Sequence, residues 1–485
     1  MKEIRFNPQT RIKELITVWT SQASSKQRAG RGGRTGPGIC FKLYTEEFAR
    51  NHMPRQTSPE IMRTPLEELI LQICLLEEQQ DKGGSDPEHF LKGAPESPPK
   101  SNIESACSHL QEMGALSRVS SEDRTMFRLT PLGYHLSQLP MDPKVGKILV
   151  VGCILQCIEP ALTVAATLSV PHSIWLSYLP GVENSTKQAR LVHEDLIRNG
   201  FGGASWESGS VKGDSIAAIA AYNAWSSSTK SSKTNRNKQL REFAAEHALN
   251  NNVLMDIKGL RRQYKDTLRA SGLLRFNESD NKYGDDPLLT SCCLVAGLYP
   301  NVASLVRPSK ELKINRAFLI TKFGEKCFSS SDSFQSGRIR KASESKRDAY
   351  AVFHSKHLTT GTITHEPSGP KKKSNPFLSN VNFVSKFAIL LFCGDIEVQN
   401  NCLIVDEWLK FKVDDIDQPK TEKSVYKGQV NSILTSELRK ELDFILLRHL
   451  VENNDDSQGD MLQQECERVI KVVRQMLHSD GASNK

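Results

Sequence analysis

The stretch LTPLGYHLSQLPMDPKVGKILVVGCILQCIEPALTVAATLSV, residues 129–170, combines legible helix starts with an almost continuous apolar run. Thr130–Pro131 and Asp142–Pro143 each place a capping residue before a proline, a pair that favours the first turn of a helix. The apolar run is broken at Glu159–Pro160 and then resumes. The stretch therefore predicts the interior of a helical bundle, in which the apolar residues serve packing and not chemistry.

The residues upstream of this stretch predict a small helical unit with one short strand. Thr64 and Glu67 match a capping box, as do Ser101 and Glu104, so each pair predicts a helix start. A short alternating segment and a third helix start follow. Two helices, a strand and a further helix predict a winged helix over residues 53–130.

Downstream, the apolar pattern keeps its helical period for about another hundred residues. Leu254, Ile257, Tyr264 and Leu268 recur on one side of a single long helix. We therefore expect the helical bundle to span residues 131–276.

The apolar segments after residue 288 are short and are separated by polar turns. AFLITKF, AYAVFHS, FAILLFCGDIEVQ and CLIVDEWLKFKV each have the length and composition of a strand. Such strands predict a small barrel over residues 288–420. Residues 421–485 are expected to form a terminal helix and a polar tail, which makes the whole chain an α+β protein of several domains.

Composition narrows the class of protein. The 485 residues are 38% hydrophobic and 25% charged, which is typical of a globular chain with more than one core. The longest apolar run, Ile148–Ile158, is too short to cross a bilayer, and the first residues contain no signal-peptide pattern. We therefore expect no membrane partner and a cytoplasmic or nuclear location.

The eleven cysteines include no CxxC pair, so no metal site is expected. The net charge of +8 favours a nucleic-acid partner.

An arginine-rich segment near the start, KQRAGRGGRTGPGICFKLY, spans residues 26–44. Arg28, Arg31 and Arg34 follow one another at a spacing of three among glycines. Guanidinium groups so arranged favour phosphate binding, because each offers a planar fork of donors and stays charged. The sequence contains no GxxxxGK[ST] loop to hold a triphosphate, so the arginines are interpreted as half of a site. The alternative interpretation is a solvated basic turn.

In the order arginine segment, winged helix, helical bundle and small barrel, the chain resembles the C-terminal half of a DEAH-box RNA helicase. Motif VI of that family, QRxGRAGR, corresponds to residues 27–34, with a glycine at residue 32 in place of the usual alanine, and PGICFKLYTEEFA follows it. SPEIMRTPLEELILQI, AGLYPNVA and ILLFCGDIEVQ resemble family segments in family order. TSQASSKQRAGRGGRTGPGICFKLY and LRRQYKDTLRASGLL are similar to the subgroup linked to nonsense-mediated mRNA decay, whereas the barrel is more similar to other members.

The resemblance implies roles for the arginine segment. Gln27, Arg31 and Arg34 would contact ATP from the second RecA-like domain, of which residues 1–52 would be the C-terminal remnant. Arg31 and Arg34 would be catalytic, because arginine fingers stabilise the charge that spreads over the transferring phosphoryl group. ATP and Mg²⁺ are the implied cofactors of the full-length helicase, with neither bound by this chain alone, since motifs I, II, III and V lie outside it.

The resemblance also implies an RNA path. EIRFNPQTRIKELITVW corresponds to a β-hairpin that lies near the emerging strand, and the residues around Asn7 and Pro8 permit a hairpin turn. The family places an OB-type barrel over the RNA exit, so Arg338, Arg340 and Lys341 are predicted to bind single-stranded RNA. The alternative for this basic loop is a solvated surface. A protein activator is a further expected partner.

Two functions of different classes follow. The first is the C-terminal part of an ATP-dependent RNA helicase, which would couple ATP hydrolysis to RNA translocation and unwinding when joined to an ATP-binding domain. The second is a noncatalytic RNA-binding or regulatory protein that docks on a complete helicase. An in-frame Walker A loop upstream of Met1 would favour the first, and its absence would favour the second.

Overall fold

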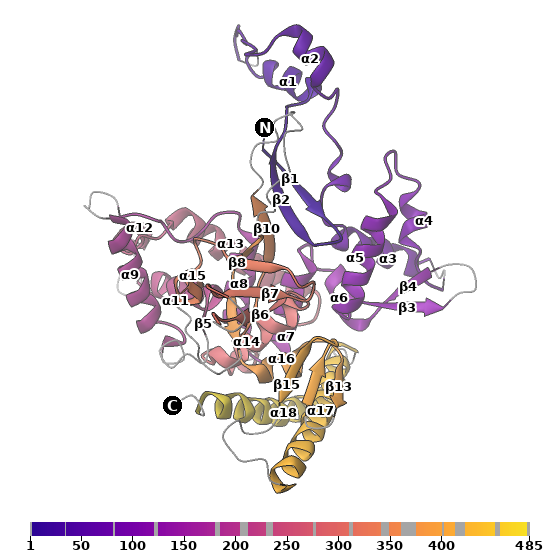
Figure 1. Ribbon diagram of the computed structural model, residues 1–485, viewed down its shortest axis with the longest axis vertical. Helices are drawn as coiled ribbons and strands as arrows, with labels where there is room; N and C mark the ends of the chain where they lie inside the picture. Colours follow the sequence, from indigo (N-terminus) through magenta and orange to yellow (C-terminus); the bar gives the residue numbers. More distant parts are fainter. Residues whose placement is uncertain are drawn as a thin grey trace.

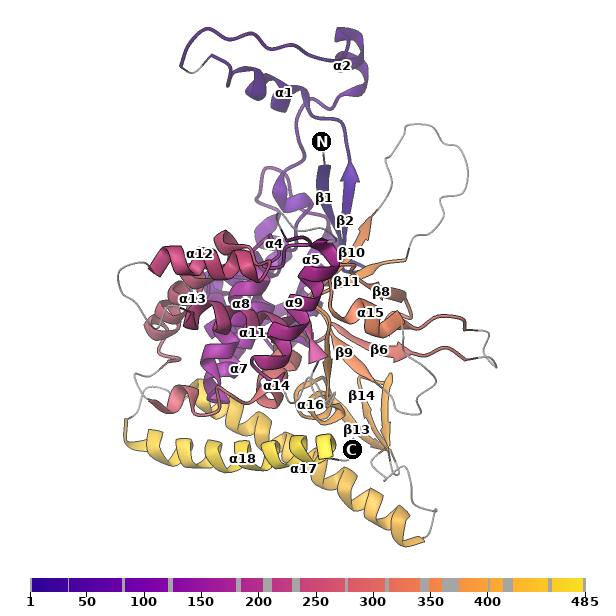
Figure 2. The same ribbon diagram turned by 90° about the vertical axis from the view of Figure 1, so that its left-hand side faces the viewer.

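The structure is a computed structural model in which the elements lie around one central helical bundle (Figure 1). It describes residues 2–33, 35–80, 83–120, 125–179, 185–203, 212–228, 236–274, 278–309, 314–340, 349–359, 375–399, 402–412, 422–451 and 456–482. Strands lie on one side of the bundle, the last two helices lie below it, and the N-terminal elements project from the opposite end (Figure 2).

The winged-helix region consists of short helices and a two-stranded sheet. Its elements are η1 (Glu60–Met62), α3 (Glu67–Glu78), α4 (Pro87–Leu91), α5 (Lys100–Glu112), β3 (Leu116–Ser120), β4 (Thr125–Leu129) and α6 (Pro131–Ser137). The helix start at Thr130 is confirmed, because its side chain accepts a hydrogen bond from the backbone N–H of Gly133. The two predicted capping boxes are wrong. Ser101 lies inside α5, and Thr64 bonds the carbonyl of Glu60 instead of capping α3.

The helical bundle is the largest part of the fold. Its helices are α7 (Pro143–Ile154), α8 (Ile158–Ser169), α9 (Ser185–Asn199), α11 (Asp214–Ser227), α12 (Arg236–Glu246), α13 (Asn251–Ala270), η2 (Glu278–Asn281) and α14 (Pro287–Leu298). Asp142 caps α7 as predicted. The break after α7 was predicted a few residues too late. It falls at Gln156, whose φ is 53°, while Pro160 sits in the first turn of α8, where a missing N–H costs nothing.

The strands form one large open sheet and a small separate one. The strands outside the winged helix are β1 (Lys2–Asn7), β2 (Ile12–Thr17), β5 (Lys212–Gly213), β6 (Val302–Val306), β7 (Phe318–Thr321), β8 (Lys326–Ser329), β9 (Tyr350–Val352), β10 (Ser355–Thr359), β11 (Phe377–Ser379), β12 (Asn382–Val384), β13 (Ile396–Gln399), β14 (Cys402–Val405) and β15 (Leu409–Lys412). In the part of the chain that the structure describes, the large sheet has the order β1-β2-β10-β11-β8-β7-β6-β9-β12-β5, and β13-β14-β15 stand apart.

The predicted OB-type barrel is therefore not confirmed. The described strands do not close, because β2 of the N-terminal hairpin pairs in parallel with β10 and extends the sheet at that edge. The first part of FAILLFCGDIEVQ, predicted as a strand, forms helix α16 (Lys386–Phe392). Ser385 caps this helix, and every residue from Ala388 to Phe392 is buried. Because the apolar residues lie all round the helix, the sequence shows no period that would distinguish it from a buried strand.

Two long helices, α17 (Glu422–Val451) and α18 (Asp456–Ala482), end the chain. The prediction of a polar tail is wrong, because Cys466, Ile470, Val473 and Leu477 of α18 are buried. Their spacing of three and four residues places them on one face of the helix. Ile470, Val473 and Leu477 join the same continuous core as the bundle helices and α16. No helix in the described ranges has the length and apolar character needed to span a membrane.

Candidate nucleic-acid interface

The arginine segment, residues 26–44, starts in the second half of α1 (Gln22–Ala29), which lies beside α2 (Glu46–His52) at the projecting end of the molecule (Figure 1). Ser21 caps α1, and the side-chain amide of Gln22 donates to the carbonyls of Ala49 and Met53 at 2.7 and 3.1 Å. These bonds fix α1 against the end of α2. The local fold is thus held by polar contacts near the start of the helix, upstream of the predicted site residues.

Two of the three predicted ATP-contacting residues, Gln27 and Arg31, lie in and just after the exposed end of α1. Gln27 is exposed in the last turns of the helix, and Arg31 is exposed in the turn that follows. Arg34 lies outside the described residues. The structure therefore places Gln27 and Arg31 within one short solvent-facing segment, and the position of Arg34 relative to them stays a prediction.

An extended apolar segment follows this turn. Ile39, Phe41 and Leu43 are 82%, 82% and 98% exposed. Their alternation is the pattern of a strand with one apolar face, and burying such a face is strongly favourable. Exposed apolar surface of this kind marks an interaction site. The segment therefore has the character of a strand that another body covers.

The N-terminal hairpin of β1 and β2 confirms the sequence prediction. The Asn7 side-chain oxygen accepts hydrogen bonds from the backbone N–H groups of Gln9 and Thr10 at 3.1 and 3.3 Å, which stabilises the turn after Pro8. Arg11 completes the turn with a φ of 53°. The two strands then pair antiparallel along their whole length.

The turn of the hairpin is fastened to the winged helix. The Ser105 hydroxyl donates to the carbonyl of Pro8 at 2.7 Å, and Arg11 Nη1 lies 2.9 Å from Glu112 Oε2. Both partners belong to α5. Because β2 also pairs with β10, the hairpin is bound at once to the winged helix and to the large sheet, while the chain beyond β2 leads to α1.

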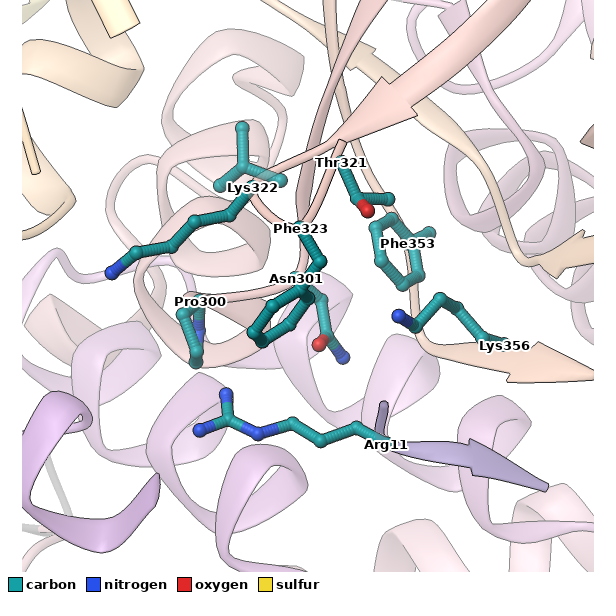
Figure 3. A pocket seen from close by; sticks show the side chains of 9 residues that line it. Arg11, Pro300, Asn301, Thr321, Lys322, Phe323, Phe353 and Lys356 are labelled. Carbon is teal, nitrogen blue, oxygen red and sulfur yellow. The ribbon is translucent and has the colours of Figure 1, made fainter. Parts of the chain in front are cut away.

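A shallow cleft, which we call the hairpin-tip cleft, lies between the turn of the hairpin and the strands of the large sheet (Figure 3). Arg11 extends into it from the hairpin, and Lys322 and Phe323 come from the turn between β7 and β8. The cleft encloses about 20 Å³, room for about one water molecule. It is therefore too small to hold a nucleotide or another small-molecule ligand.

The charges in the hairpin-tip cleft are largely paired. Lys356 is 3% exposed and forms an ion pair with Glu325. Its ammonium also lies 5.1 Å from the centroid of the Phe323 ring. Phe323 is 52% exposed, and Lys322 beside it is exposed. The rim of the cleft thus presents an aromatic ring and a cation to solvent, whereas its floor is neutralised.

A half-buried polar junction involves β2 of the hairpin, the start of α7 and the segment before β10. Burial and the nearby charge of Lys144 lower the pKa of Lys13 on β2. Burial and the same lysine lower the pKa of His354 to about 3, so this imidazole is neutral at physiological pH. Burial opposes ionisation of Asp142, but Lys144 and other cations hold its pKa below the usual value. Lys144 Nζ lies 3.6 Å from Asp142 Oδ2 at the start of α7, and the charges of this pair act on Lys13 of β2 and on His354 before β10.

The predicted RNA-binding loop begins in α15 (Gln335–Arg340), which carries the backbone of Arg338 and Arg340. Their side chains and Lys341 lie outside the described residues. The segment before α15 is anchored, because Asp214 accepts hydrogen bonds from the Ser333 hydroxyl and the Phe334 N–H, both at 3.0 Å. RNA contact by this loop stays a prediction.

Asp214 itself is a buried carboxylate at the start of α11. Its second oxygen accepts the N–H of Val381 at 2.9 Å, so it ties α11 to the segments before α15 and β12. Burial raises the pKa of this carboxyl to about 6, although its three hydrogen bonds favour the charged form.

Sequence reasoning missed Arg11 and Phe323. The signal for Phe323 is TKFGEK, in which a lysine and an aromatic residue precede a glycine at a strand end. Gly324 adopts a φ of 72°, as a tight turn requires. Arg11 had no local signal, because its partner Glu112 is distant in sequence. Among the residues that the structure describes, no group of three His, Cys, Asp or Glu side chains is arranged to hold a metal ion.

Two family comparisons match the middle of the chain. Residues 108–141 match the winged-helix part of the helicase-associated domain (HA2), and residues 142–249 match its ratchet-like part. The first match covers β3, β4 and α6, and the second covers most of the helical bundle.

Curated relatives match almost the whole chain. It is 27% identical over 487 residues to the ATP-dependent DNA/RNA helicase DHX36 of Bos taurus, covering 98% of this chain and 41% of the relative. It is 29% identical over 434 residues to the chloroplastic DExH-box ATP-dependent RNA helicase DExH4 of Arabidopsis thaliana, covering 84% and 28%. A putative DEAH-box ATP-dependent helicase of Mycosarcoma maydis is 27% identical, covering 99% and 29%. The chain thus spans about a third of the length of these relatives.

Proposed function

This chain matches the C-terminal portion of DEAH-box helicases, and on that premise we propose that it is the nucleic-acid-engaging part of an ATP-dependent RNA helicase. Joined to an ATP-binding domain, it would couple ATP hydrolysis to RNA translocation and unwinding. The protein activator expected from the sequence remains part of this proposal.

The proposal rests on one observation, the way in which the hairpin is attached to its neighbours. It is bonded to the winged helix through Arg11 and Glu112 and to the large sheet through β10, and its second strand continues into α1. A displacement of the arginine segment would therefore be transmitted to the elements of the proposed RNA path. Rigid, packed elements of this kind carry conformational coupling between distant sites.

The arginine segment supports the ATP-dependent part of the proposal. Gln27 and Arg31 are exposed, and so is the extended apolar segment of Ile39, Phe41 and Leu43, which would be covered by the rest of a RecA-like domain. Their donors fit an anionic phosphate and not a cation, so Mg²⁺ would be held elsewhere. When ATP is bound, Arg31 and Arg34 would orient and neutralise the transferring phosphoryl group.

RNA binding by the 485-residue chain tests the proposal without the ATP-binding domain. Fluorescence anisotropy with a labelled single-stranded RNA should show saturable binding that weakens as salt rises. Changing Arg338, Arg340 and Lys341 together to Glu should weaken binding and lower the log–log salt slope by about 2, since each lost phosphate contact removes roughly 0.7. Absence of RNA binding by the folded chain would overturn the proposal.

The noncatalytic alternative is favoured by one observation, the exposed apolar segment of Ile39, Phe41 and Leu43, which equally fits docking on a separate protein. The two functions differ in one measurement. A chain fused to an ATP-binding domain should hydrolyse ATP in an RNA-stimulated manner under the first proposal. Under the second, the separate chain should instead change the turnover of an intact helicase.

A further inference from the structure

The outer face of the large sheet carries an aromatic and basic surface. We call it the aromatic–basic face, and it consists of Arg316, Phe318, Lys326, Phe328 and Phe377 on and beside β7, β8 and β11. The positions that alternate with these on the same strands point inward, because Leu319, Cys327 and Leu378 are fully buried.

The rings of this face are held side by side by strand pairing. Phe377 of β11 is the register partner of Phe328 of β8, and β8 pairs with β7, which carries Phe318. Phe377 is 40% exposed, and the other two rings are partly exposed. The pairing therefore lines up three aromatic rings across neighbouring strands, which are spaced about 4.8 Å apart.

Two cations lie over these rings. The Lys326 ammonium is 4.4 Å from the Phe318 centroid, and the Arg316 guanidinium is 4.9 Å from the Phe328 centroid. Both cations are exposed. The other outward positions on the described parts of these strands are Ile320 and Ser379, so no carboxylate shares the face there. Glu325, the nearest acid along the chain, is paired with the buried Lys356.

This combination fits one class of partner. A neutral apolar partner would not use the cations, and an acidic peptide would not use a row of flat rings. A single-stranded nucleic acid uses both, because its bases stack on aromatic rings and its phosphates pair with the cations between them. A duplex does not fit, since its bases are already stacked on one another.

We propose that the aromatic–basic face is a base-stacking site for single-stranded nucleic acid, in which Phe328 and Phe377 stack on bases while Arg316 and Lys326 contact phosphates. The proposal rests on the proposed function, because it assumes that the chain binds nucleic acid. It adds that binding depends on the bases themselves and not only on the backbone charge. The site lies outside the predicted loop of Arg338, Arg340 and Lys341.

The test compares two strands of equal length and charge, a single-stranded RNA and an abasic strand with the same number of phosphates. Phe328→Leu and Phe377→Leu keep an apolar side chain, so the sheet should remain folded. Each should weaken binding of the RNA by about fivefold to 150-fold, as expected for one lost stack, and leave binding of the abasic strand unchanged. Phe444→Leu is the matched control, because Phe444 is 58% exposed on α17, away from this sheet.

Variants of the two cations should change RNA binding and its salt dependence in a different way. Arg316→Gln and Lys326→Gln should weaken binding of both strands and lower the salt slope by about 0.7 each, whereas the phenylalanine variants should leave the slope unchanged. A Phe377→Trp variant gives a direct readout, since a stacked base should quench the fluorescence of the introduced indole.

The outcomes separate this inference from the proposed function. If the parent chain binds neither strand, the proposed function fails and takes the inference with it. If the parent binds both strands and the phenylalanine variants bind RNA as tightly as the Phe444→Leu control, the inference alone is wrong. The fluorescence change on adding saturating RNA is compared between the Phe377→Trp variant and the parent chain. If the variant shows no more quenching than the parent, stacking is also contradicted.

Discussion

The ion pair between Arg11 and Glu112 should control how tightly the hairpin is held to the winged helix. Arg11 Nη1 lies 2.9 Å from Glu112 Oε2, and the two side chains are 14% and 28% exposed. At that separation and an effective dielectric constant of ~20, the attraction is about 6 kcal/mol. Lost hydration and partial exposure offset most of this, so a net coupling of about 1–2 kcal/mol is expected.

A double-mutant cycle with Arg11→Met and Glu112→Gln measures this coupling. The readout is native-state hydrogen exchange of the hairpin, residues 2–17, because the pair restrains the local opening of that element. Each single variant should speed exchange about 5- to 30-fold, which corresponds to 1–2 kcal/mol. The double variant should exchange little faster than either, as expected for residues that share one interaction.

An exposed ion pair is the control for this cycle. Arg50 and Glu46 are 74% and 79% exposed, and Arg50→Met should leave the exchange of the hairpin unchanged. Hairpin exchange that is unaltered in Arg11→Met, or single-variant effects that simply add in the double variant, would refute the idea that this pair fastens the hairpin.

Three further predictions concern the buried carboxylate, the last helix and the isolated chain. Burial raises the pKa of the Asp214 carboxyl from its ordinary 3.8 to about 6. The folded state therefore binds an extra proton between about pH 4 and 6, so this group stabilises the protein as pH falls through that window, by up to about 3 kcal/mol. The melting temperature of the parent relative to Asp214→Asn should be higher at about pH 4.5 than at about pH 7.5, and parallel profiles would contradict this. Leu477 is fully buried, so Leu477→Ala should lower the free energy of unfolding by about 2–5 kcal/mol. Val472→Ala, on the exposed face of α18, should lower it by less than about 0.5 kcal/mol. Equal denaturation midpoints for the two variants would contradict the packing of α18 in the core. The isolated chain should show no RNA-stimulated ATP hydrolysis above a buffer blank, and a turnover that survives repurification but vanishes in Arg31→Ala would disprove that expectation.

Local signals in the sequence predicted local structure well where the capping chemistry was unambiguous. Thr130 and Asp142, each followed by a proline, cap helices as expected. The pattern at Ser101 also satisfies the capping-box rule, yet the N-cap of α5 is Pro99, two residues earlier. A proline that fixes φ competes with a serine cap, and the sequence alone does not rank the two.

The arrangement of the strands depended on long-range contacts that no local pattern contains. The pairing of β2 with β10 joins segments far apart in the sequence, and it leaves the sheet open where a closed barrel was expected. The second terminal helix, by contrast, could have been found. Cys466, Ile470, Val473 and Leu477 recur at helical spacing in a segment whose overall polarity hid them.

The candidate site was predicted only in part for the same reason. The motif order located the arginine segment and the hairpin, because both are short and local. The aromatic–basic face is assembled from β7, β8 and β11. β8 ends at Ser329 and β11 begins at Phe377, so these two strands are far apart in the sequence. Only strand pairing brings Phe328 and Phe377 together, so the sequence offered no reason to group them.

In the proposed function, Arg31 and Arg34 complete an ATP site and act on the transition state. The most direct measurement is RNA-stimulated ATP turnover in a protein that joins this chain to an ATP-binding domain of the family. Arg31→Ala and Arg34→Ala should each lower kcat by roughly 10³ or more while nucleotide binding stays within a few-fold, Arg34→Lys should not restore it, and Arg28→Ala should be milder. Turnover at the parent rate in both alanine variants, or a loss in Arg28→Ala as large as in Arg34→Ala, would contradict these roles of Arg31 and Arg34.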